Sequence, residues 1–208
     1  ILAMAKNLCP DCKRASIAVI AVVGALYFQT ALGQIAMIAL GGVLGLVLIK
    51  NVTELPHEPL KINLNSAWSF GALAGFVLLL FILPFIAVHF DEHGLKLFDS
   101  FYRAGSLVFG GGHVVLPLLK NEVVNSGWVT LDAFVAGYGA AQAVPGPLFT
   151  FSAYLGAISQ VPPSGIVGAV ICLTAAFLPS FLLVIGVLPF WEKLRKFRTM
   201  GITMLGIN

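Results

Sequence analysis

One apolar stretch of the sequence, "FGGGHVVLPLL" from Phe109 to Leu119, carries three consecutive glycines and a histidine. Gly110, Gly111 and Gly112 each cost a helix up to about 1 kcal/mol relative to alanine, and His113 titrates near neutral pH. A helix broken here exposes unpaired N–H groups at the start of its second half, near His113. Such groups bind anions, and glycines let the backbone approach the ion closely. The stretch therefore predicts an anion site.

A second break follows in the next apolar run, at "VPGPLFT". Pro145 and Pro147 flank Gly146, and each proline costs about 3 kcal/mol in a regular helix because it removes an amide donor. The second half of this helix would begin near Gly146 to Phe149, close to the Thr150 hydroxyl. Two half-helix starts that face each other would form a nest for a small oxyanion, as in transporters built on discontinuous helices.

Polar side chains around the two breaks fit such a site. Arg103 lies about two helical turns before Gly110 and supplies fixed positive charge. Gln142 adds a neutral donor on the helical face that it shares with Tyr138. The candidates for substrate binding are Arg103, Gly110, Gly111, Gly112, His113, Gln142, Pro145, Gly146, Pro147 and Thr150, and those for proton coupling are His113, Glu122 and Asp99.

Each of these features also has a structural explanation, which the sequence leaves open. Glycines permit close helix packing, and prolines can simply kink a membrane helix. Arg103 can extend to the membrane surface, His113 can be a buried hydrogen-bonded ring, and Asp99 and Glu122 can mark membrane boundaries. The joint occurrence of both breaks with Arg103 and His113 favours function over packing.

The composition is that of a membrane protein. Of the 208 residues, 59% are hydrophobic and 10% are charged, and the mean hydropathy is +0.97, whereas a soluble domain has about 25% charged residues. The apolar runs are continuous rather than alternating, which predicts helices and not a barrel. We therefore expect an all-α polytopic protein of the cell (inner) membrane. The net charge of +3 is too small to indicate a nucleic-acid partner.

The apolar runs predict about six transmembrane segments, two of them discontinuous, because roughly 20 apolar residues cross the hydrocarbon core. Re-entrant hairpins in the two discontinuous segments are an alternative that the sequence leaves open. The first two are short and would form a tight hairpin, with Gly41 and Gly45 as packing glycines. A further run begins after Arg198. Because the chain starts at Ile1 and stops at Asn208 inside that run, we expect a fragment of a longer chain. The six segments are Ser16–Leu32, Ile35–Ile49, Ala67–Val88, Leu95–Leu119, Leu131–Ile158 and Ile166–Phe190.

Basic residues predict how these segments are oriented, because Lys and Arg stay on the cytoplasmic side. Ten of the twelve fall on one side of a six-crossing arrangement, including Lys120 after the fourth segment. Trp128 would lie near the same cytoplasmic boundary. The loops Lys50–Asn65 and Glu192–Thr199 would then be cytoplasmic, while His89–Gly94 and Ser159–Gly165 would face outward.

The two broken stretches, "FGGGHVVLPLL" and "GWVTLDAFVAGYGAAQAVPGPLFTFSAYLGA", resemble the chromate ion transporter family over about Phe101 to Ala157. The resemblance implies export of chromate from the cytoplasm, with a link to sulfate in some members. Long members contain two homologous halves of opposite orientation, and short members are single halves. By this resemblance, the chain looks like the carboxy-terminal half of a long member, and residues 66–208 are a chromate-transporter repeat and one half of an inverted-repeat transporter. Residues 1–65 are two short transmembrane segments and a cytoplasmic linker. The implied partner is the homologous other half or a homodimer partner.

The sequence therefore predicts a secondary transporter that exports chromate and confers chromate resistance, with the oxyanion and the lipid bilayer as its partners. Transport or exchange of sulfate or another oxyanion by the same site is one alternative. A membrane scaffold subunit or a membrane-embedded enzyme is another, although no paired carboxylates or His-rich metal clusters are visible in the spans. No Walker-type loop is visible, and no cofactor or metal is expected.

Three cysteines complete the inventory of reactive side chains. Cys9 and Cys12 form "CPDC", and a lone Cys-x-x-Cys is weak evidence for zinc because a structural site needs two more ligands. Cys172 lies in an apolar run and is expected to be a small core residue.

Overall fold

The structure is a computed structural model that describes residues 9, 11–28, 31–49, 66–107, 112–143, 148–194 and 197–207, and every element in this part of the chain is helical. This agrees with the predicted all-α class. The chain divides into two compact units, one made of residues 1–63 and 188–208 and the other of residues 64–187.

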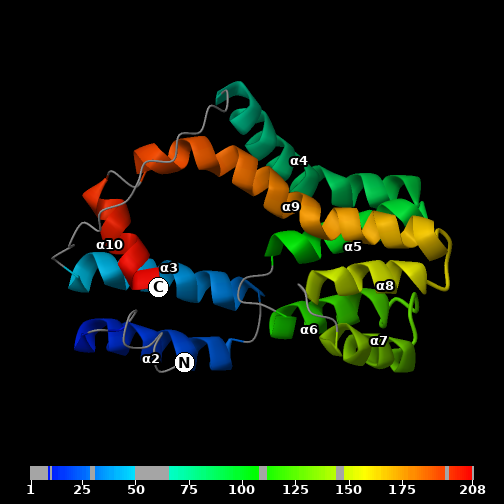
Figure 1. The fold of residues 1–208 in the computed structure, drawn as a ribbon, viewed down its shortest axis with the longest axis horizontal. Helices are drawn as coiled ribbons and strands as arrows, with labels where there is room; N and C mark the ends of the chain where they lie inside the picture. The colour runs from blue at the N-terminus through cyan, green and yellow to red at the C-terminus, as the bar shows by residue number, and fades with distance from the viewer. Residues whose placement is uncertain are drawn as a thin grey trace. The chain divides into compact units, whose positions relative to one another are not determined.

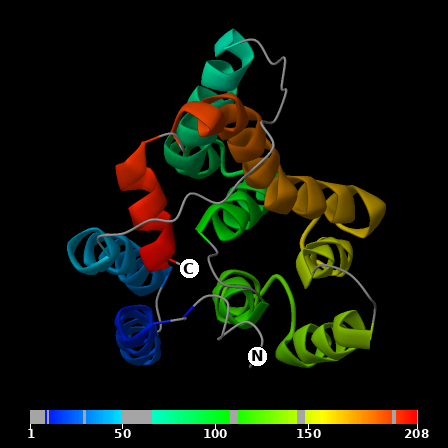
Figure 2. The ribbon, with the colours of Figure 1, turned by 60° about the vertical axis from the view of Figure 1, so that its left-hand side comes forward.

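The first unit contains α2 (Cys12–Tyr27), α3 (Ala31–Leu48) and α10 (Arg198–Ile207). Lys13 at the start of α2 donates from Nζ to the carbonyl oxygen of Leu48 at the end of α3, at 3.0 Å. The two helices are therefore antiparallel neighbours, and the predicted hairpin is confirmed. The helix expected after Arg198 is also present, and α10 packs on α3 (Figure 2).

Glycines allow α3 and α10 to approach closely. A methyl group on Gly45 would lie 2.8 Å from the Cα of Gly206, and one on Gly41 would lie 2.8 Å from the Gly206 carbonyl oxygen. No real side chain tolerates such distances without a shift of the helices. The packing role predicted for Gly41 and Gly45 is thus confirmed, with Gly206 as the partner.

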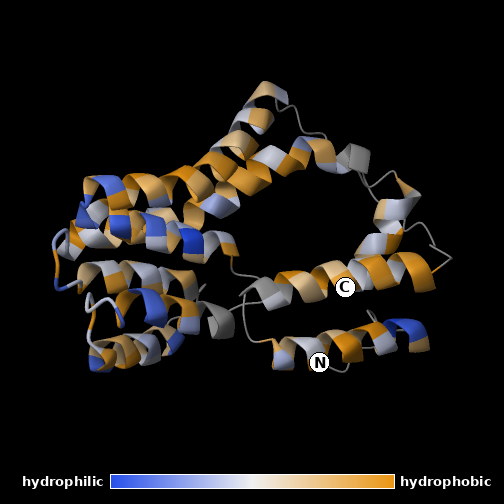
Figure 3. Cartoon of the chain, turned by 180° about the vertical axis from the view of Figure 1, so that it is seen from behind, coloured by the Kyte–Doolittle hydropathy of each residue, from blue (hydrophilic) through white to orange (hydrophobic). Residues whose placement is uncertain are grey.

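The second unit is framed by the two helices that are long and apolar enough, among the described residues, to cross a membrane. These are α4 (Ser66–Phe90) and residues Gly165–Trp191 of α9 (Gly165–Leu194). Both exceed the roughly 20 residues that the hydrocarbon core requires. Figure 3 shows them as mostly hydrophobic, whereas hydrophilic residues are concentrated on the shorter helices between them.

Four shorter helices and one 3-10 turn connect α4 to α9. They are α5 (His93–Leu107), α6 (Gly112–Val123), α7 (Leu131–Ala143), η1 (Leu148–Thr150) and α8 (Phe151–Ala157). The helix α5 ends at Leu107 and α6 begins at Gly112, while α7 ends at Ala143 and η1 begins at Leu148. The interruptions predicted at Gly110–Gly112 and Val144–Pro147 fall in residues 108–111 and 144–147, which lie outside the described residues, except for Gly112.

The chain reverses direction between α5 and α6. Ser100 Oγ donates a hydrogen bond of 2.9 Å to Glu122 Oε2, although 22 residues of continuous helix would separate the two residues by about 33 Å. Leu95–Leu119 therefore does not run in one direction, and the hairpin that the sequence leaves open is the arrangement found. The glycine triplet does not kink one path; it lies where two antiparallel half-helices are joined.

The second broken segment is folded in the same way. Tyr154 on α8 donates from its hydroxyl to the carbonyl oxygen of Ala133 on α7 at 3.1 Å, and the Phe134 and Phe151 rings meet edge to face at 5.2 Å. Both contacts join the start of α7 to α8. For Leu131–Ile158 too, the hairpin that the sequence leaves open is the arrangement found, and a single crossing is not.

The open ends of both hairpins gather at one end of this unit. His93 Nε2 lies 3.2 Å from Ser159 Oγ, the His93 and Trp128 rings meet edge to face at 4.8 Å, and the Gln160 amide donates to the Trp128 carbonyl oxygen at 2.9 Å. Figure 1 shows the α4–α5, α6–α7 and α8–α9 connections at this same end. The placement of Trp128 on the side opposite His89–Gly94 was therefore wrong, because a hairpin returns the chain to the side from which it entered.

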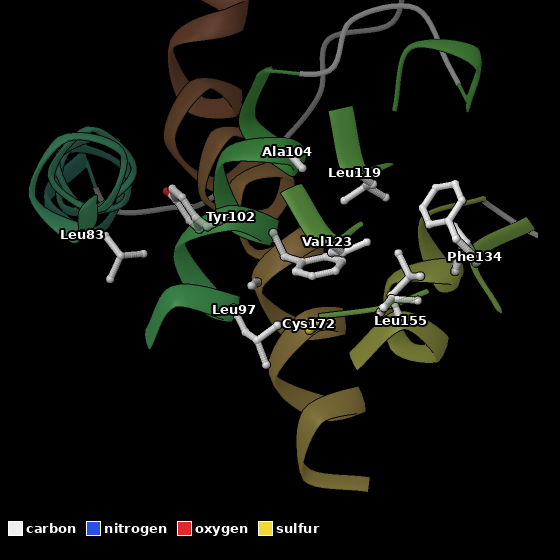
Figure 4. Close-up of a cluster of buried hydrophobic side chains, with 13 residues drawn as sticks. Leu83, Leu97, Tyr102, Ala104, Leu119, Val123, Phe134, Leu155 and Cys172 are labelled. Atoms are coloured by element: carbon white, nitrogen blue, oxygen red, sulfur yellow. The ribbon is translucent and has the colours of Figure 1, made fainter. Parts of the chain in front are cut away.

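The core of the unit lies where all six helices meet. Its largest fully buried side chains include Phe101 and Tyr102 on α5 and Phe151 on α8, and Cys172 on α9 is fully buried as predicted. Figure 4 shows residues of α5, α6 and α9 converging around Leu97, Val123 and Cys172. The helix α5 thus presents an apolar face to the core and leaves its polar side chains for the site.

Candidate functional site

Four polar side chains of the α5–α6 hairpin form the charged centre of the second unit. Arg103 Nη2 donates to Asp99 Oδ2, four residues earlier on α5, and Ser100 on the same helix holds Glu122 of α6. Asp99 is 8% exposed, and the Glu122 carboxylate is near enough to act on it electrostatically. Two carboxylates and one guanidinium therefore share one small region.

This centre lies in apolar surroundings. The helix α4 contains no Asp, Glu, Lys or Arg, and α9 contains none from Gly165 to Trp191. Charges that are poorly hydrated interact more strongly than charges in water, so the centre governs the electrostatics of the hairpin. In addition, Arg103 Nε is buried with no hydrogen-bond partner among the described residues.

The sequence interpretation found three members of this centre but not their arrangement. Arg103 was assigned to the anion, whereas Asp99 and Glu122 were assigned to proton coupling. The structure joins Arg103 to Asp99, and Ser100, the next residue on α5, holds Glu122 of α6. The four-residue spacing of Asp99 and Arg103 favours an ion pair on one helix and was the available signal for their contact. The position of Glu122 depends on the chain reversal, which has no such signal.

Gln142 and Tyr138 share a face of α7, as predicted. Gln142 Nε2 donates to the Tyr138 hydroxyl, and the Gln142 side chain is exposed. The Tyr138 ring meets the Phe151 ring of α8 edge to face at 6.2 Å. This contact ties the Gln142 end of α7 to the second half of its hairpin.

Thr150, the last residue of η1, lines a pocket of about 410 Å³ against α9. The other lining residues are Leu173, Thr174, Phe177, Leu178 and Phe181. The pocket offers two hydroxyl groups and no charge. A dianion placed there would have no ionic partner among these lining residues.

The remaining predicted residues belong to the hairpin tips. Gly112 is the first residue of α6, and His113 follows it in the first turn, close to the predicted restart of the helix. Gly110, Gly111, Pro145, Gly146 and Pro147 lie outside the described residues, as does the His113 side chain. Their assignment to the substrate stays a prediction.

Sequence reasoning missed the small residues that hold the hairpins against α9. A methyl group on Gly105 of α5 would overlap the Ala176 carbonyl oxygen, and one on Gly156 of α8 would overlap that of Gly168. In α7, a methyl group on Gly137 would overlap the Tyr154 ring. Helical spacing of small residues is the available signal for such packing. These contacts fix where the charged centre lies relative to the hairpin tips.

Possible metal ligands are sparse in the part of the chain that the structure describes. No three His, Cys, Asp or Glu side chains come together there in a way that would hold a metal ion. Cys9 and Cys12 are free thiols next to the start of α2, where Asp11 caps the helix by accepting from the Arg14 amide at 2.8 Å.

The family to which the protein belongs follows from its similarity to known sequences. The sequence model of the chromate transporter family matches residues 95–208, which is more than half of the chain and includes both hairpins. This chain belongs to the chromate transporter family. The match begins at α5 and continues through α9 and α10, so the family's shared region contains the charged centre and both breaks.

Three similar proteins match this chain over a shorter region than the family model does. The chain is 34% identical to a chromate transport protein of Pseudomonas aeruginosa over 87 residues, which are 42% of this chain and 20% of that protein. It is 40% identical over 86 residues to YwrB, an uncharacterized transporter of Bacillus subtilis, covering 40% of this chain and 42% of that protein. A second transporter of that organism, YwrA, is 36% identical over 104 residues, which are 49% of this chain and 56% of YwrA. The chain thus spans little more than half of these relatives at most. No solved structure matches it.

Proposed function

We propose that the protein carries chromate across the cell membrane, outward from the cytoplasm, as a secondary transporter that confers chromate resistance. Membership of the family and the name of the Pseudomonas aeruginosa relative support chromate as the substrate. The observation that carries the proposal is the pair of antiparallel hairpins, the first of which holds the charged centre of Asp99, Arg103 and Glu122.

The hairpins are re-entrant in this proposal, and α4 and α9 cross the membrane. The helices α5, α6 and α7 are 15, 12 and 13 residues long, or about 22, 18 and 20 Å. The hydrocarbon core is about 30 Å thick, so hairpins of this length end inside it. Irregular backbone at that depth is tolerated where it lines a polar cavity. The first residues of α6 then provide amides that have no partner within the helix.

The substrate would bind at these tips. A tetrahedral dianion needs hydrogen-bond donors and compensating positive charge when it leaves water. The start of α6 at Gly112 and the turn that leads into α8 supply amides, and Arg103 supplies charge from the last turns of α5, near the first tip. In this proposal His113, Gln142 and Thr150 add donors around the ion.

The complete path needs a second set of elements. The chain covers 20% of the Pseudomonas aeruginosa relative and 42% of YwrB. We propose that a homologous half, or a second copy of this chain, completes the cavity from the other side. Alternating access would then move the two halves around one site.

Transport into proteoliposomes tests this function. Purified protein should accumulate chromate inside vesicles that contain no nucleotide when a membrane potential is imposed, and protein-free vesicles should not. Excess sulfate in the same assay separates the two substrates, since a chromate-selective site loses little uptake to it. Absence of chromate flux under every imposed ion gradient would refute the proposal, and flux abolished by equal sulfate would favour a general oxyanion carrier.

A further inference from the structure

The arginine that the proposed function assigns to the substrate is already paired with a carboxylate. Asp99 Oδ2 accepts a hydrogen bond from Arg103 Nη2, and the exposed fraction of the side chain is 12% for Asp99 and 41% for Arg103. The oxygens of an oxyanion are the same kind of acceptor as those of a carboxylate. An oxyanion that binds Arg103 therefore competes with Asp99 for the guanidinium.

When an oxyanion displaces Asp99 from Arg103, the neighbouring Glu122 determines the charge around Asp99. Ser100 follows Asp99 on α5 and holds Glu122 at 2.9 Å, and the Glu122 charge acts on Asp99. Two carboxylates that are close together in a poorly hydrated place do not both stay ionised. A displaced Asp99 would therefore be left beside a second negative group without its cation.

The helices around the charged centre contain no described cation that could replace Arg103. The helix α4 has His89 as its only titratable side chain, at its far end, and the titratable side chain of α9 between Gly165 and Trp191 is Cys172. Lys96 on α5 bonds to Asp91 in the α4–α5 turn. Lys120 on α6 is exposed. His93 at the start of α5 lies against Ser159 and Trp128 at the open end of the hairpins. Among the described residues, a proton is therefore the remaining source of positive charge.

We propose that oxyanion binding at Arg103 displaces Asp99 and is balanced by the uptake of one proton, which Asp99 and Glu122 then share. This rests on the proposed function, because it needs an anion at Arg103. Without the proton, one positive charge would face four negative ones, two from the dianion and one from each carboxylate. The proton comes from water, only the Asp99–Arg103 ion pair is broken, and no covalent bond changes.

The empty and loaded states then differ in a defined way. In the empty state Asp99 satisfies Arg103, so the site can reorient without an uncompensated arginine in the membrane. In the loaded state the anion and one proton travel together. The dianion moves with a single proton, so one net negative charge is carried, and a membrane potential that is negative inside drives it outward. Asp99 is thus an internal competitor that links anion occupancy to protonation.

The pH dependence of chromate affinity tests this link without requiring transport. Binding to the purified protein in detergent is measured by equilibrium dialysis, at several pH values at which chromate is fully ionised. Uptake of one proton makes the dissociation constant rise about tenfold per pH unit. A pH indicator in weakly buffered solution should register close to one proton taken up for each chromate bound.

Three variants separate this link from a structural role. Asp99→Asn removes the competitor, so chromate should bind more tightly and with no pH dependence. Glu122→Gln removes the neighbouring carboxylate and should flatten the pH dependence. Because it leaves the Asp99–Arg103 pair in place, it provides the test if Asp99→Asn does not fold. Asp132→Asn makes the same chemical change at an exposed position in the first turn of α7 and should behave as wild type.

The outcomes distinguish this inference from the proposed function. Chromate binding with a pH-independent dissociation constant in the wild type would overturn the proton link and leave the transport proposal standing. Wild-type pH dependence in both Asp99→Asn and Glu122→Gln would also overturn it. No chromate binding by the wild type at any pH would overturn both.

Discussion

Gly156 on α8 and Gly168 on α9 face each other so closely that a methyl group on either would overlap the carbonyl oxygen of the other. This contact lies beside the turn that joins the second hairpin to the long helix α9. It leaves no room for any side chain, because the conflicting atoms are backbone atoms that cannot rotate away.

The substitution Gly168→Ala should therefore destabilise the protein. Its methyl group would also lie 2.8 Å from the Pro163 carbonyl oxygen, and overpacking of this kind typically costs about 1–3 kcal/mol. We expect a lower midpoint of thermal unfolding in detergent, measured by the fluorescence of a thiol-reactive dye or by loss of the monodisperse chromatographic peak.

Gly139→Ala is the matched control for this substitution. A methyl group on Gly139 of α7 would meet nothing within 4 Å, and alanine favours a helix by up to about 1 kcal/mol over glycine. This variant should be as stable as wild type or more stable. Equal midpoints for the two variants would contradict the close approach of α8 and α9.

Cross-linking tests the reversal of the first hairpin. Because the His93 and Trp128 rings are 4.8 Å apart, the double variant His93→Cys with Trp128→Cys should be joined by a short thiol cross-linker in native membranes. Under a single crossing of Leu95–Leu119, the two positions would lie on opposite membrane surfaces, roughly 30 Å apart. The product is detected by mass spectrometry of the linked peptides.

A second pair of cysteines controls for random collision. Gln142 ends α7 some twelve residues after Thr130, or about 18 Å from the open end of its hairpin. The pair His93→Cys with Gln142→Cys should therefore remain unlinked by the same short reagent. Efficient linking of this pair would contradict the hairpin arrangement. So would the absence of any linking between the cysteines at positions 93 and 128.

The sequence was sufficient to locate the helix breaks but not the direction of the chain after them. Three glycines and two prolines predict that a helix stops, because their helix propensities are poor. A run of 25 apolar residues has the same hydropathy whether it crosses or folds back. The reversal depends on contacts between distant residues, such as Ser100 with Glu122, and one sequence contains no record of those pairs.

The charged residues of the site show the same limit. Arg103, Asp99 and Glu122 stood out because ionisable groups are costly inside an apolar chain. The sequence interpretation assigned Arg103 to the substrate and the two carboxylates to proton coupling, because nothing in the spacing places Glu122 beside α5. Counting basic residues on each side of the predicted segments also misplaced Trp128, because the positive-inside rule assumes that each apolar run crosses.

Cysteine labelling tests the proposed re-entrant arrangement. Single cysteines at Glu92, Asn125 and Gln160 lie in the three connections at the open end of the hairpins and should react with a membrane-impermeant maleimide from the same side. A cysteine at Ser66, at the opposite end of α4, should react only from the other side. If Asn125 were labelled from the side of Ser66, the chain would cross the membrane once between Glu92 and Asn125, and the re-entrant arrangement would be wrong.

Substitution of Arg103 tests the charge at the proposed substrate site. Arg103→Ala should abolish chromate transport, but it also leaves Asp99 buried without its partner, and breaking such a pair costs about 3–5 kcal/mol. The double variant Arg103→Gln with Asp99→Asn removes both charges and should fold while still failing to transport. Arg103→Lys should keep part of the activity, because the charge remains and the planar fork is lost.

Exposed Lys120 on α6 provides the comparison for this series. Lys120→Gln removes a positive charge from the same hairpin without touching the ion pair, and its initial rate of chromate uptake should match that of wild type. If the double variant at Arg103 and Asp99 transports chromate at the wild-type rate, the arginine is structural and the substrate uses other groups.

The substitution His113→Gln separates two sources of pH dependence. Histidine titrates near neutral pH, and His113 lies in the first turn of α6 beside the glycine triplet. Glutamine keeps the ability to donate a hydrogen bond and removes the titration. If Asp99 and Glu122 take up the proton, the dissociation constant of chromate in His113→Gln should still rise about tenfold per pH unit, as in wild type. If His113 carries the proton, this variant should bind chromate with one affinity over the pH values at which chromate is fully ionised, and the shared proton of the two carboxylates would be excluded. Measuring His113→Gln and Asp99→Asn side by side over the same pH range assigns the proton to one group or the other.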